Sequence, residues 1–540
     1  MDSFDYVIVG AGAAGCVLAN RLSSDPSVSV CVLEAGGRDS NPYIRMPAGF
    51  VKTVYGDKIS WPFKTAPGAG IDGREIRLPQ GKVRGGSSSI NGMVYNRGQR
   101  ADFDHWAQFG NRGWGFDDLL PYFKRSERRI GVGDDEVRGR EGEVPITDMD
   151  WIHPVCEAFL DSAGGLGIPR NPDYNSGLQF GAGYYQRFIN NGRRVSAARA
   201  FLRPALARQN VTLRENVHVM GIDLRGRQAT GVRYRDSRGG EYAVQARREV
   251  LLSCGTANSP KLLQISGIGP ASLLNELGVP VVHALAGVGE NLRDHYSARM
   301  VARARNTRTI NQYARWPHLP FQFMKWLVGK PSVLGICPSV AYVHAKSQPD
   351  LEDADIRILF TPGSYAQGRT YILDDYPGMT CGAAQPRPQS SGFVRAASRD
   401  PLVAPIIQPN YLTDEADQRI TVIGMRLVRA ILNGPELSEF FDAETLPGPE
   451  ATTDDELLDF ARHYGNTGYH LVGTCRMGPA GDTRSVVDDE LRVHGIDGLR
   501  VVDASIMPML PSANTYAATL AIAEKAADMI RGVSQQTPTQ

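Results

Sequence analysis

A glycine-rich turn directly after the first predicted strand constrains the fold of this chain more than any other feature. Gly10, Gly12 and Gly15 form a GxGxxG pattern between the apolar run Phe4–Val9 and an expected helix over about Ala13–Leu22. The first glycine allows a tight turn, the second lets the backbone approach a pyrophosphate, and the third lets the helix pack closely on the strand. Free N–H groups at the helix N-terminus then face the anion. The pattern predicts a βαβ unit that binds a dinucleotide.

An acidic residue at the end of the second predicted strand supports this interpretation. That strand covers about Val28–Leu33, and Glu34 follows about 20 residues after the last glycine. A carboxylate at this point can bind the ribose hydroxyls of an adenosine and disfavours a ribose phosphate, so NADP is not expected. NAD and FAD both satisfy the pattern, and this part of the sequence does not choose between them.

Composition and charge exclude several classes of protein. The 540 residues carry 59 Lys+Arg against 58 Asp+Glu, which offers no basic footprint for nucleic acid. The seven cysteines are scattered without a CxxC pair, so neither a zinc site nor a dithiol motif is predicted, and no metal is expected. No apolar run reaches about 18 residues, so no transmembrane segment is expected. With no recognisable signal peptide we expect a cytoplasmic protein, with peripheral membrane contact left open.

Strands and helices alternate at both ends of the chain, whereas residues 300–440 are less regular and carry scattered aromatic residues expected to be mainly core. Further elements are expected as a helix near Ser196–Arg208, strands near Val211–Leu213, Val217–Arg225, Ala229–Tyr234, Glu249–Ser253 and Leu499–Val502, and a helix of about Tyr516–Arg531. The length exceeds that of one usual core. We therefore predict an α/β protein whose nucleotide-binding domain is assembled from separated segments, with a substrate domain inserted between them.

A second glycine-rich segment lies at residues 81–92, GKVRGGSSSING. It lacks the lysine pattern of a phosphate-binding P-loop. Paired glycines let backbone approach a flat or anionic ligand, and three serine hydroxyls can bond its polar edges. On physical grounds alone, a flexible surface loop explains the segment nearly as well.

This segment resembles the first signature of the glucose-methanol-choline (GMC) family of FAD-dependent flavoprotein oxidoreductases, and residues 255–269, GTANSPKLLQISGIG, resemble the second. Further similarity lies in GVGENLRDH at 287–295, YHLVGTCRMG at 469–478, VDAS at 502–505 and Asn514-Thr515. The motifs occur in order, so the resemblance covers essentially the whole chain. The sequence looks most like the bacterial alcohol, sorbose, choline and polyethylene glycol dehydrogenases.

The resemblance implies a fold and a domain arrangement. We expect a Rossmann-like FAD-binding domain with an interleaved substrate domain built on a mainly antiparallel sheet. The expected FAD-binding parts are residues 1–155, with a flavin-covering loop at about 40–100, then 196–297 and 463–540; the expected substrate-domain parts are 156–195 and 298–462.

The resemblance also implies which residues contact FAD. Val219 would meet the adenine through its backbone, Asp503 and Ala504 would lie near the pyrophosphate and ribityl chain, and Asn514 and Thr515 beside the isoalloxazine. The expected cofactor-binding residues are Gly10, Gly12, Ala13, Ala14, Gly15, Glu34, Ala35, Val83, Gly86, Asn91, Gly92, Val94, Val219, Asp503, Ala504, Asn514 and Thr515. Some relatives bond the flavin covalently through a histidine, and the matching position here is Ile90. An aliphatic side chain cannot form that bond, so we expect non-covalent FAD.

The family's catalytic pair, a histidine with a second histidine or asparagine, matches His470 and Asn514. An alcohol releases hydride readily only as its O–H proton leaves, and imidazole is a suitable base at neutral pH. Asn514 can hydrogen-bond the alkoxide but cannot take the proton. A histidine or asparagine in such contexts is commonly structural, Asn514 as a helix N-cap for example, and only the family motif favours the catalytic role. His295 is expected to be structural.

Two departures from the family pattern bear on the substrate. Related dehydrogenases commonly have proline where this chain has Leu471, and asparagine where it has Tyr516. Tyr516 could place a ring near the active-site mouth or alter access to the flavin. Both differences leave the redox assignment unchanged.

The expected function is therefore FAD-dependent oxidation of a small-molecule alcohol to an aldehyde or ketone, with oxygen or a quinone-like compound as the electron acceptor. Three alternatives stay open: a lyase that cleaves hydroxynitriles with a redox-silent flavin, a flavin-binding protein without catalysis, and an NAD enzyme. The sequence does not identify the alcohol.

Overall fold

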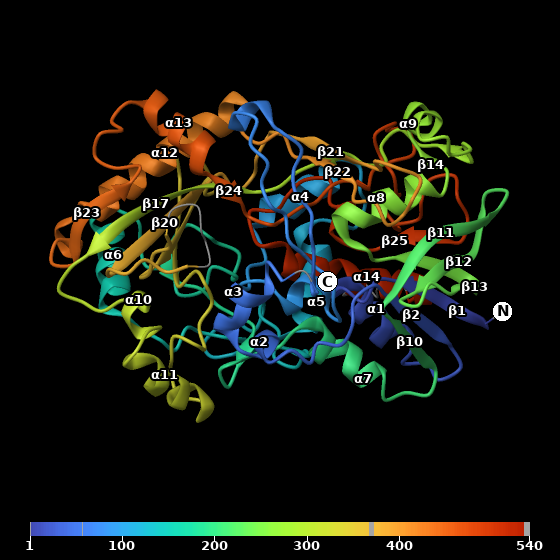
Figure 1. The fold of residues 1–540 in the computed structure, drawn as a ribbon, viewed down its shortest axis with the longest axis horizontal. Helices are drawn as coiled ribbons and strands as arrows, with labels where there is room; N and C mark the ends of the chain where they lie inside the picture. Colours follow the sequence, from blue (N-terminus) through green and yellow to red (C-terminus); the bar gives the residue numbers. More distant parts are fainter. Residues whose placement is uncertain (1, 57, 367–371, 534–540) are drawn as a thin grey trace.

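Two seven-stranded sheets, each assembled from distant parts of the chain, organise this protein (Figure 1). The computed structural model describes residues 2–56, 58–366 and 372–533. Each sheet belongs to its own large hydrophobic core, and the candidate site lies where the two sheets approach each other.

The first sheet contains the predicted βαβ unit. Its strands are β1 (Asp2–Val9), β2 (Val30–Glu34), β10 (Val211–Glu215), β11 (Val217–Arg225), β12 (Gln228–Asp236), β13 (Glu241–Leu252) and β25 (Leu499–Val501). The order β10-β2-β1-β13 is parallel throughout, β25 pairs in parallel with β13, and β12 and β11 extend the sheet antiparallel. All five residues of β2 are buried, as expected for a parallel strand covered on both faces. The helices α1 (Ala13–Leu22) and α14 (Thr515–Arg531) pack together against this sheet.

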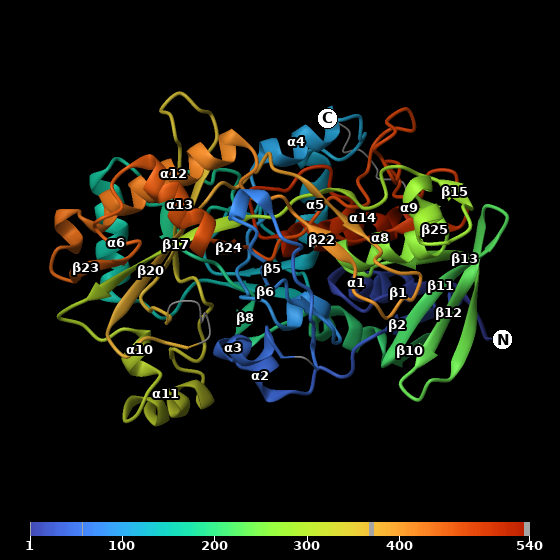
Figure 2. The same cartoon turned by 45° about the horizontal axis from the view of Figure 1, so that its top comes forward.

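The second sheet is antiparallel. Its strands are β7 (Gly181–Tyr184), β17 (Tyr296–Ala304), β18 (Ala341–Ala345), β19 (Ile356–Thr361), β20 (Gly378–Ala384), β23 (Phe441–Leu446) and β24 (Asn466–Thr467). The helices α6 (Pro154–Gly165), α12 (Glu415–Leu432) and α13 (Asp454–Tyr464) pack against this sheet (Figures 1 and 2). A face of β17, β19 and β20 is therefore left to line a cavity.

Shorter elements connect and cover the two sheets. The remaining α-helices of the described residues are α2 (Pro42–Arg45), α3 (Phe50–Thr53), α4 (Arg100–Gln108), α5 (Phe116–Ser126), α7 (Arg203–Ala205), α8 (Gly255–Ile265), α9 (Ala271–Glu276), α10 (Ile310–Tyr313) and α11 (His318–Leu327). The remaining strands are β3 (Ser60–Trp61), β4 (Gln80–Gly81), β5 (Glu127–Ile130), β6 (Val144–Thr147), β8 (Ile189–Asn190), β9 (Arg193–Arg194), β14 (Ile268–Gly269), β15 (His283–Ala284), β16 (Glu290–Leu292), β21 (Gly392–Arg395) and β22 (Ile406–Gln408). Among the described residues, no helix combines the length and hydropathy needed to cross a bilayer.

The predicted fold class is confirmed, with two local corrections. The helix expected near Ser196–Arg208 is present but shorter: residues 197–205 are helical, with a π-helical turn over Ala198–Leu202 followed by the short α7, in which Pro204 has no N–H to donate. Residues 300–440, predicted to be less regular, contain β18, β19, β20 and α12 and part of β17. Those strands are short and largely buried, so they lack the polar–apolar alternation that reveals a half-exposed strand. The domain boundaries stay predictions, and residues 534–540 of the last part lie outside the described residues.

Candidate active site

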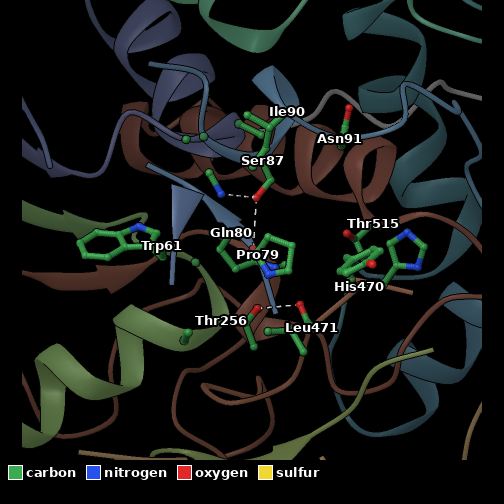
Figure 3. Close-up of a pocket in the computed structure, with 18 of the residues that line it drawn as sticks. Trp61, Pro79, Gln80, Ser87, Ile90, Asn91, Thr256, His470, Leu471 and Thr515 are labelled. Atoms are coloured by element: carbon green, nitrogen blue, oxygen red, sulfur yellow. Dashed lines mark hydrogen bonds between the residues drawn. The ribbon is translucent and has the colours of Figure 1, made fainter. Parts of the chain in front are cut away.

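A cavity of about 460 Å³ lies between the two sheets. The carboxyl ends of β1 and β2, the loop from residue 79 to 94, one face of the second sheet and the segments around His470 and Asn514 line it. In Figure 3, Trp61 lies towards one side of the view and His470 and Thr515 towards the other, with Ile90 and Ser87 on one wall and Leu471 and Thr256 on the facing wall.

The glycine turn at one end of the cavity leaves no room for side chains. Gly10 has φ +101°, and a Cβ on Gly15 would lie 1.9 Å from the Gly10 carbonyl oxygen, so α1 can pack on β1 only through glycine. Gly86 has φ +52°, and a Cβ there would lie 2.9 Å from the Gly12 Cα, so the two glycine loops touch each other. No side chain caps α1 at Gly12, which leaves its first N–H groups for a ligand. This is the cradle that a pyrophosphate requires.

Glu34 lies at the same end, where it lines the cavity and is itself buried. Its carboxylate accepts hydrogen bonds from the Ala11 N–H (2.8 Å) and the Gly36 N–H (2.7 Å). Burial raises the pKa of Glu34 to about 7, and these two backbone donors oppose the rise. The side chain is thereby fixed where the sequence predicted a ribose-binding carboxylate.

The second glycine loop covers the middle of the cavity. The Ser87 hydroxyl donates to Gln80 Oε1 (3.1 Å) and accepts from the Gly81 N–H (3.1 Å), which ties the loop to β4 (Figure 3). Asn91 accepts from the buried Arg194 guanidinium at 2.8 Å. The loop is therefore a fixed wall and not the free surface loop that the sequence alone allowed.

The structure brings most predicted cofactor residues together. Those that line the cavity are Gly10, Gly12, Ala13, Ala14, Glu34, Ala35, Gly86, Asn91, Gly92, Val94, Val219, Asp503, Ala504, Asn514 and Thr515. Gly15 is not a lining residue, in keeping with its packing role. Val83, predicted to line the flavin, does not line the cavity either: it is fully buried and packs in a cluster with Ile44 and Ile90. Ile90 is the member of that cluster that reaches the cavity.

His470 and Asn514 meet at the other end of the cavity, with His470 Nε2 2.9 Å from Asn514 Nδ2. Asn514 Oδ1 accepts from the Arg357 guanidinium at 2.8 Å. Because arginine only donates, this contact fixes the amide orientation, and the Asn514 NH₂ group faces the histidine. Asn514 is the N-cap residue of α14, but its side chain makes no capping hydrogen bond. Its side chain therefore serves the site.

His295 fixes the tautomer of His470. His295 Nε2 lies 2.7 Å from the Pro386 carbonyl oxygen, which only accepts, so this nitrogen carries a proton. Burial lowers the pKa of His295 to about 3, so its ring is neutral and Nδ1 is an acceptor. His470 Nδ1, 2.9 Å away, is consequently the donor. The proton of His470 lies on Nδ1, and Nε2 presents its lone pair towards Asn514 and the cavity.

Electrostatics keep His470 neutral. Burial, the neighbouring His295 and the Arg357 charge together hold the pKa of His470 well below its usual value. Asp294 accepts from the His470 backbone N–H at 2.6 Å and from the Tyr411 hydroxyl at 2.5 Å, and it also accepts from Thr467. The buried carboxylate thereby anchors the segment that carries the histidine. A neutral, oriented imidazole can accept a proton from a ligand in the cavity.

The sequence did not reveal the roles of two residues of this network, His295 and Arg357, and it left the position of Tyr516 open. His295, expected to be structural, contacts His470 directly; its place next to Asp294 in the GVGENLRDH motif was the available signal. Arg357 carries no motif and was not identified. Tyr516 lines the cavity, but its ring is 7% exposed and lies 4.5 Å from that of Phe188, so it forms part of a wall.

Comparison with known proteins identifies the family. Residues 4–297 and 388–523 match the two family models described as GMC oxidoreductase. The chain belongs to the GMC oxidoreductase family. It is 39% identical to an alcohol dehydrogenase [acceptor] of Pseudomonas putida over 538 residues, covering 98% of this chain and 95% of that protein. It is 37% identical to an oxygen-dependent choline dehydrogenase of Photobacterium profundum over 540 residues, covering 99% and 94%.

A solved structure shows the same fold. Pyridoxine 4-oxidase from Mesorbium loti superposes with a TM-score of 0.88 at 31% identity, covering 98% of this chain and 100% of that one. The resemblance inferred from the sequence motifs is confirmed, and the protein is an oxidoreductase. Membership of the GMC family implies FAD as the cofactor.

The residues present fit FAD. The glycine cradle would hold the pyrophosphate, Glu34 the adenosine ribose, and the loop from Ser87 to Gly92 the flavin ring. Because the same cavity continues to His470 and Asn514, a cofactor bound in this way would lie beside both of them.

Proposed function

We propose that this GMC oxidoreductase oxidises an alcohol to an aldehyde or ketone, with non-covalently bound FAD and His470 as the base. Bound FAD would supply the ring that accepts a hydride from the carbinol carbon. The relatives named alcohol and choline dehydrogenase support a CH–OH donor. Ile90, at the position where some relatives carry a flavin-linked histidine, supports dissociable FAD.

The hydrogen-bond direction around His470 carries the proposal. Nδ1 is committed as a donor to His295, so Nε2 is the acceptor, and it can take the hydroxyl proton of an alcohol that replaces the Asn514 NH₂ group as its hydrogen-bond partner. The Asn514 NH₂ group, held by Arg357, can donate to the developing alkoxide oxygen and stabilise its charge. The proton thus leaves the oxygen while the adjacent carbon loses its hydride. The product departs as a carbonyl, and the electrons pass on to oxygen or a quinone-like acceptor.

Anaerobic reduction of the bound flavin tests this function. Mixing the yellow holoenzyme with primary, secondary and benzylic alcohols should bleach the flavin absorbance and yield the matching carbonyl compound. His470→Ala should slow bleaching by about 100-fold or more, the usual contribution of a general base. His463→Ala, on the surface of α13, is the matched control and should react like wild type. Acid precipitation should leave the FAD in the supernatant.

Each alternative gives a different result. Cyanide release from a hydroxynitrile without bleaching would establish the lyase, and reduction of added NAD without a yellow chromophore would establish the nicotinamide enzyme. Equal bleaching by His470→Ala and wild type would remove His470 as the base. Running the assay with oxygen and with an artificial quinone identifies the preferred acceptor.

A further inference from the structure

The second sheet turns alternate residues of three strands towards the catalytic end of the cavity, as the two-residue period of a strand requires. The residues that line the cavity are Ser297 and Arg299 of β17, Arg357, Leu359 and Thr361 of β19, and Thr380, Gly382 and Ala384 of β20. Two of them are arginines, and both lie on the side of the cavity that carries His470. The sheet therefore places two cations over the reaction site.

The register leaves space between these two arginines. Ala384 of β20 pairs with Ser297 on one side and Arg357 on the other, and Gly382 pairs with Arg299 and Leu359. The strand between the arginines thus presents only glycine and alanine. Long side chains on flanking strands can lean over such small residues towards a common point.

Neither arginine has a carboxylate partner among the described residues. The Arg357 guanidinium, nearly fully buried, donates to Asn514 Oδ1 and to the Tyr185 hydroxyl (3.3 Å). Arg299 interacts with the phenol of Tyr469. Burial lowers the pKa of three surrounding histidines, His295, His344 and His470, and the positive charge of Arg357 lowers it further.

The acidic residues that line the described cavity are Glu34 and Asp503, and both are engaged elsewhere. The Glu34 oxygens accept from backbone N–H groups, and Asp503 accepts from the Gly255 N–H (2.9 Å) and the Ser259 hydroxyl (2.6 Å). A buried guanidinium without a counter-ion is costly, so a bound anion would relieve a cost already present in the protein. Ser297 Oγ is buried without a hydrogen-bond partner and faces the same space.

We propose that Arg299, Arg357 and Ser297 form an anion subsite, and that the preferred alcohols of this enzyme carry a carboxylate distant from the hydroxyl group. The assignment rests on the proposed alcohol oxidation. A carboxylate can form paired, charge-assisted hydrogen bonds with a guanidinium, and the Ser297 hydroxyl adds a donor. Arg357 also positions Asn514, so Arg299 is the residue whose role is confined to specificity. A quaternary ammonium group would face two like charges and is excluded.

Matched pairs of acid and amide test the subsite, because each pair differs in charge and hardly in shape. The holoenzyme is assayed by flavin bleaching with 4-(hydroxymethyl)benzoate against 4-(hydroxymethyl)benzamide, and with 6-hydroxyhexanoate against its amide. At least one acid should be favoured over its amide by tenfold or more in kcat/KM. Arg299→Gln should abolish that preference, bringing acid and amide to within threefold of each other, and Arg299→Lys should keep part of it. Choline should leave the flavin oxidised.

A binding measurement separates this proposal from the proposed function. Benzoate should shift the flavin spectrum at a Kd at least tenfold lower than benzamide, and Arg299→Gln should equalise the two. Amides oxidised as fast as acids, with equal binding of benzoate and benzamide, would overturn the subsite and leave alcohol oxidation standing. Tight benzoate binding without bleaching by any alcohol would keep the subsite and overturn the proposed function.

A second observation, independent of the cavity, concerns α11. A helix that packs on a core buries its apolar residues, whereas α11 exposes them and buries a polar one. Within α11, which is described completely, only Gln322 is buried; its carbonyl accepts from the Ser332 hydroxyl (2.8 Å) and its side chain from the Val333 N–H (3.2 Å). The large apolar residues in and next to the helix are 37–83% exposed: Trp316, Leu319, Phe321, Phe323, Met324, Leu327 and Val328. In both overall views α11 lies at the margin of the molecule (Figures 1 and 2).

The stretch of sequence that contains this helix carries charge of a single sign. The sequence contains no acidic residue between Asp294 and Asp350. Five basic residues of this stretch lie within the helix or within about 15 positions of it in the sequence: Arg305, Arg308, Arg315, Lys325 and Lys330. Within the described part of the chain, none of these five forms an ion pair; Lys325 lies over the Phe321 ring and Arg315 donates to the Leu373 carbonyl.

We infer that α11 binds the surface of an anionic lipid bilayer, lying in its plane. Exposed aromatic and aliphatic side chains enter the boundary between headgroups and acyl chains, and the flanking lysines and arginines meet anionic headgroups. A two-fold contact between copies of this chain would bring the same basic residues together, so charge disfavours that alternative.

Vesicle flotation of the holoenzyme tests this surface. The protein should float with phosphatidylcholine vesicles that contain about one quarter phosphatidylglycerol, and less with phosphatidylcholine alone or in high salt. The double variant Trp316→Ser, Phe321→Ser should partition at least tenfold more weakly. Val132→Ser, Leu178→Ser, at exposed apolar positions elsewhere, is the matched control and should float like wild type.

The described residues of α11 do not line the cavity, so the double variant should oxidise soluble alcohols at the wild-type rate. Wild-type protein that stays unbound, or a double variant that floats equally well, would overturn the inference. A dimer in size-exclusion chromatography that the double variant dissociates, without flotation, would replace the bilayer with a second copy.

Discussion

The tautomer assigned to His470 predicts that replacing His295 will strongly slow alcohol oxidation, although His295 does not itself transfer a proton in the proposed reaction. In His295→Leu, the Nδ1–H of His470 loses its buried acceptor. An unsatisfied buried donor costs about 1–3 kcal/mol, and the ring can avoid this cost only by moving its proton to Nε2. That nitrogen then faces the Asn514 NH₂ group and cannot accept a proton from the alcohol. The base-competent tautomer is thereby disfavoured by about 5- to 150-fold.

The rate constant of anaerobic flavin reduction at saturating alcohol measures this effect, because it isolates chemistry from binding. We expect His295→Leu to lower that rate constant by the stated factor with less than a threefold change in the apparent Kd of the alcohol and with full FAD content. In His295→Asn, the side-chain oxygen can take the position of the lost Nδ1 acceptor, so most of the rate should return. Wild-type rates in His295→Leu, or equal losses in the leucine and asparagine variants, would refute the assigned hydrogen-bond direction.

Three further changes test the cofactor cradle and the electrostatics. Glu34→Gln should weaken FAD binding about 10- to 150-fold, since a charge-assisted hydrogen bond contributes roughly 1.5–3 kcal/mol; fluorescence titration of the apoprotein measures it. Arg357→Met removes a positive charge that lowers the pKa of His470, so that pKa rises. Because protonated His470 cannot act as a base, the loss of activity on acidification should begin at a higher pH than in wild type, and an unmoved pH profile would contradict the assigned cause. Gly86→Ala adds a Cβ against the first glycine turn and should lose FAD, whereas Gly226→Ala, also at positive φ but with no neighbour within 4 Å, should retain it.

The local parts of this protein follow from residues close together in the chain. Gly10, Gly12 and Gly15 require one turn geometry between a strand and a helix, and Glu34 ends the next strand, so the dinucleotide cradle is determined by about 30 consecutive residues. The motifs that carry His470 and Asn514 likewise predicted these two residues as the catalytic pair without coordinates, through family resemblance.

What only the tertiary structure decided is which distant residues surround that pair. His295 directly precedes β17 and Arg357 lies in β19, two strands of an antiparallel sheet whose buried strands give no alternating pattern, so the sequence shows neither their proximity nor the face they present. Which ring nitrogen of His470 carries the proton depends, through His295, on the backbone carbonyl of Pro386, and no sequence motif indicates this contact. The conformation of a turn is determined by the residues within it, so the sequence shows it directly. The polarity and charge of an active site arise from contacts between distant segments, which only the folded chain brings together.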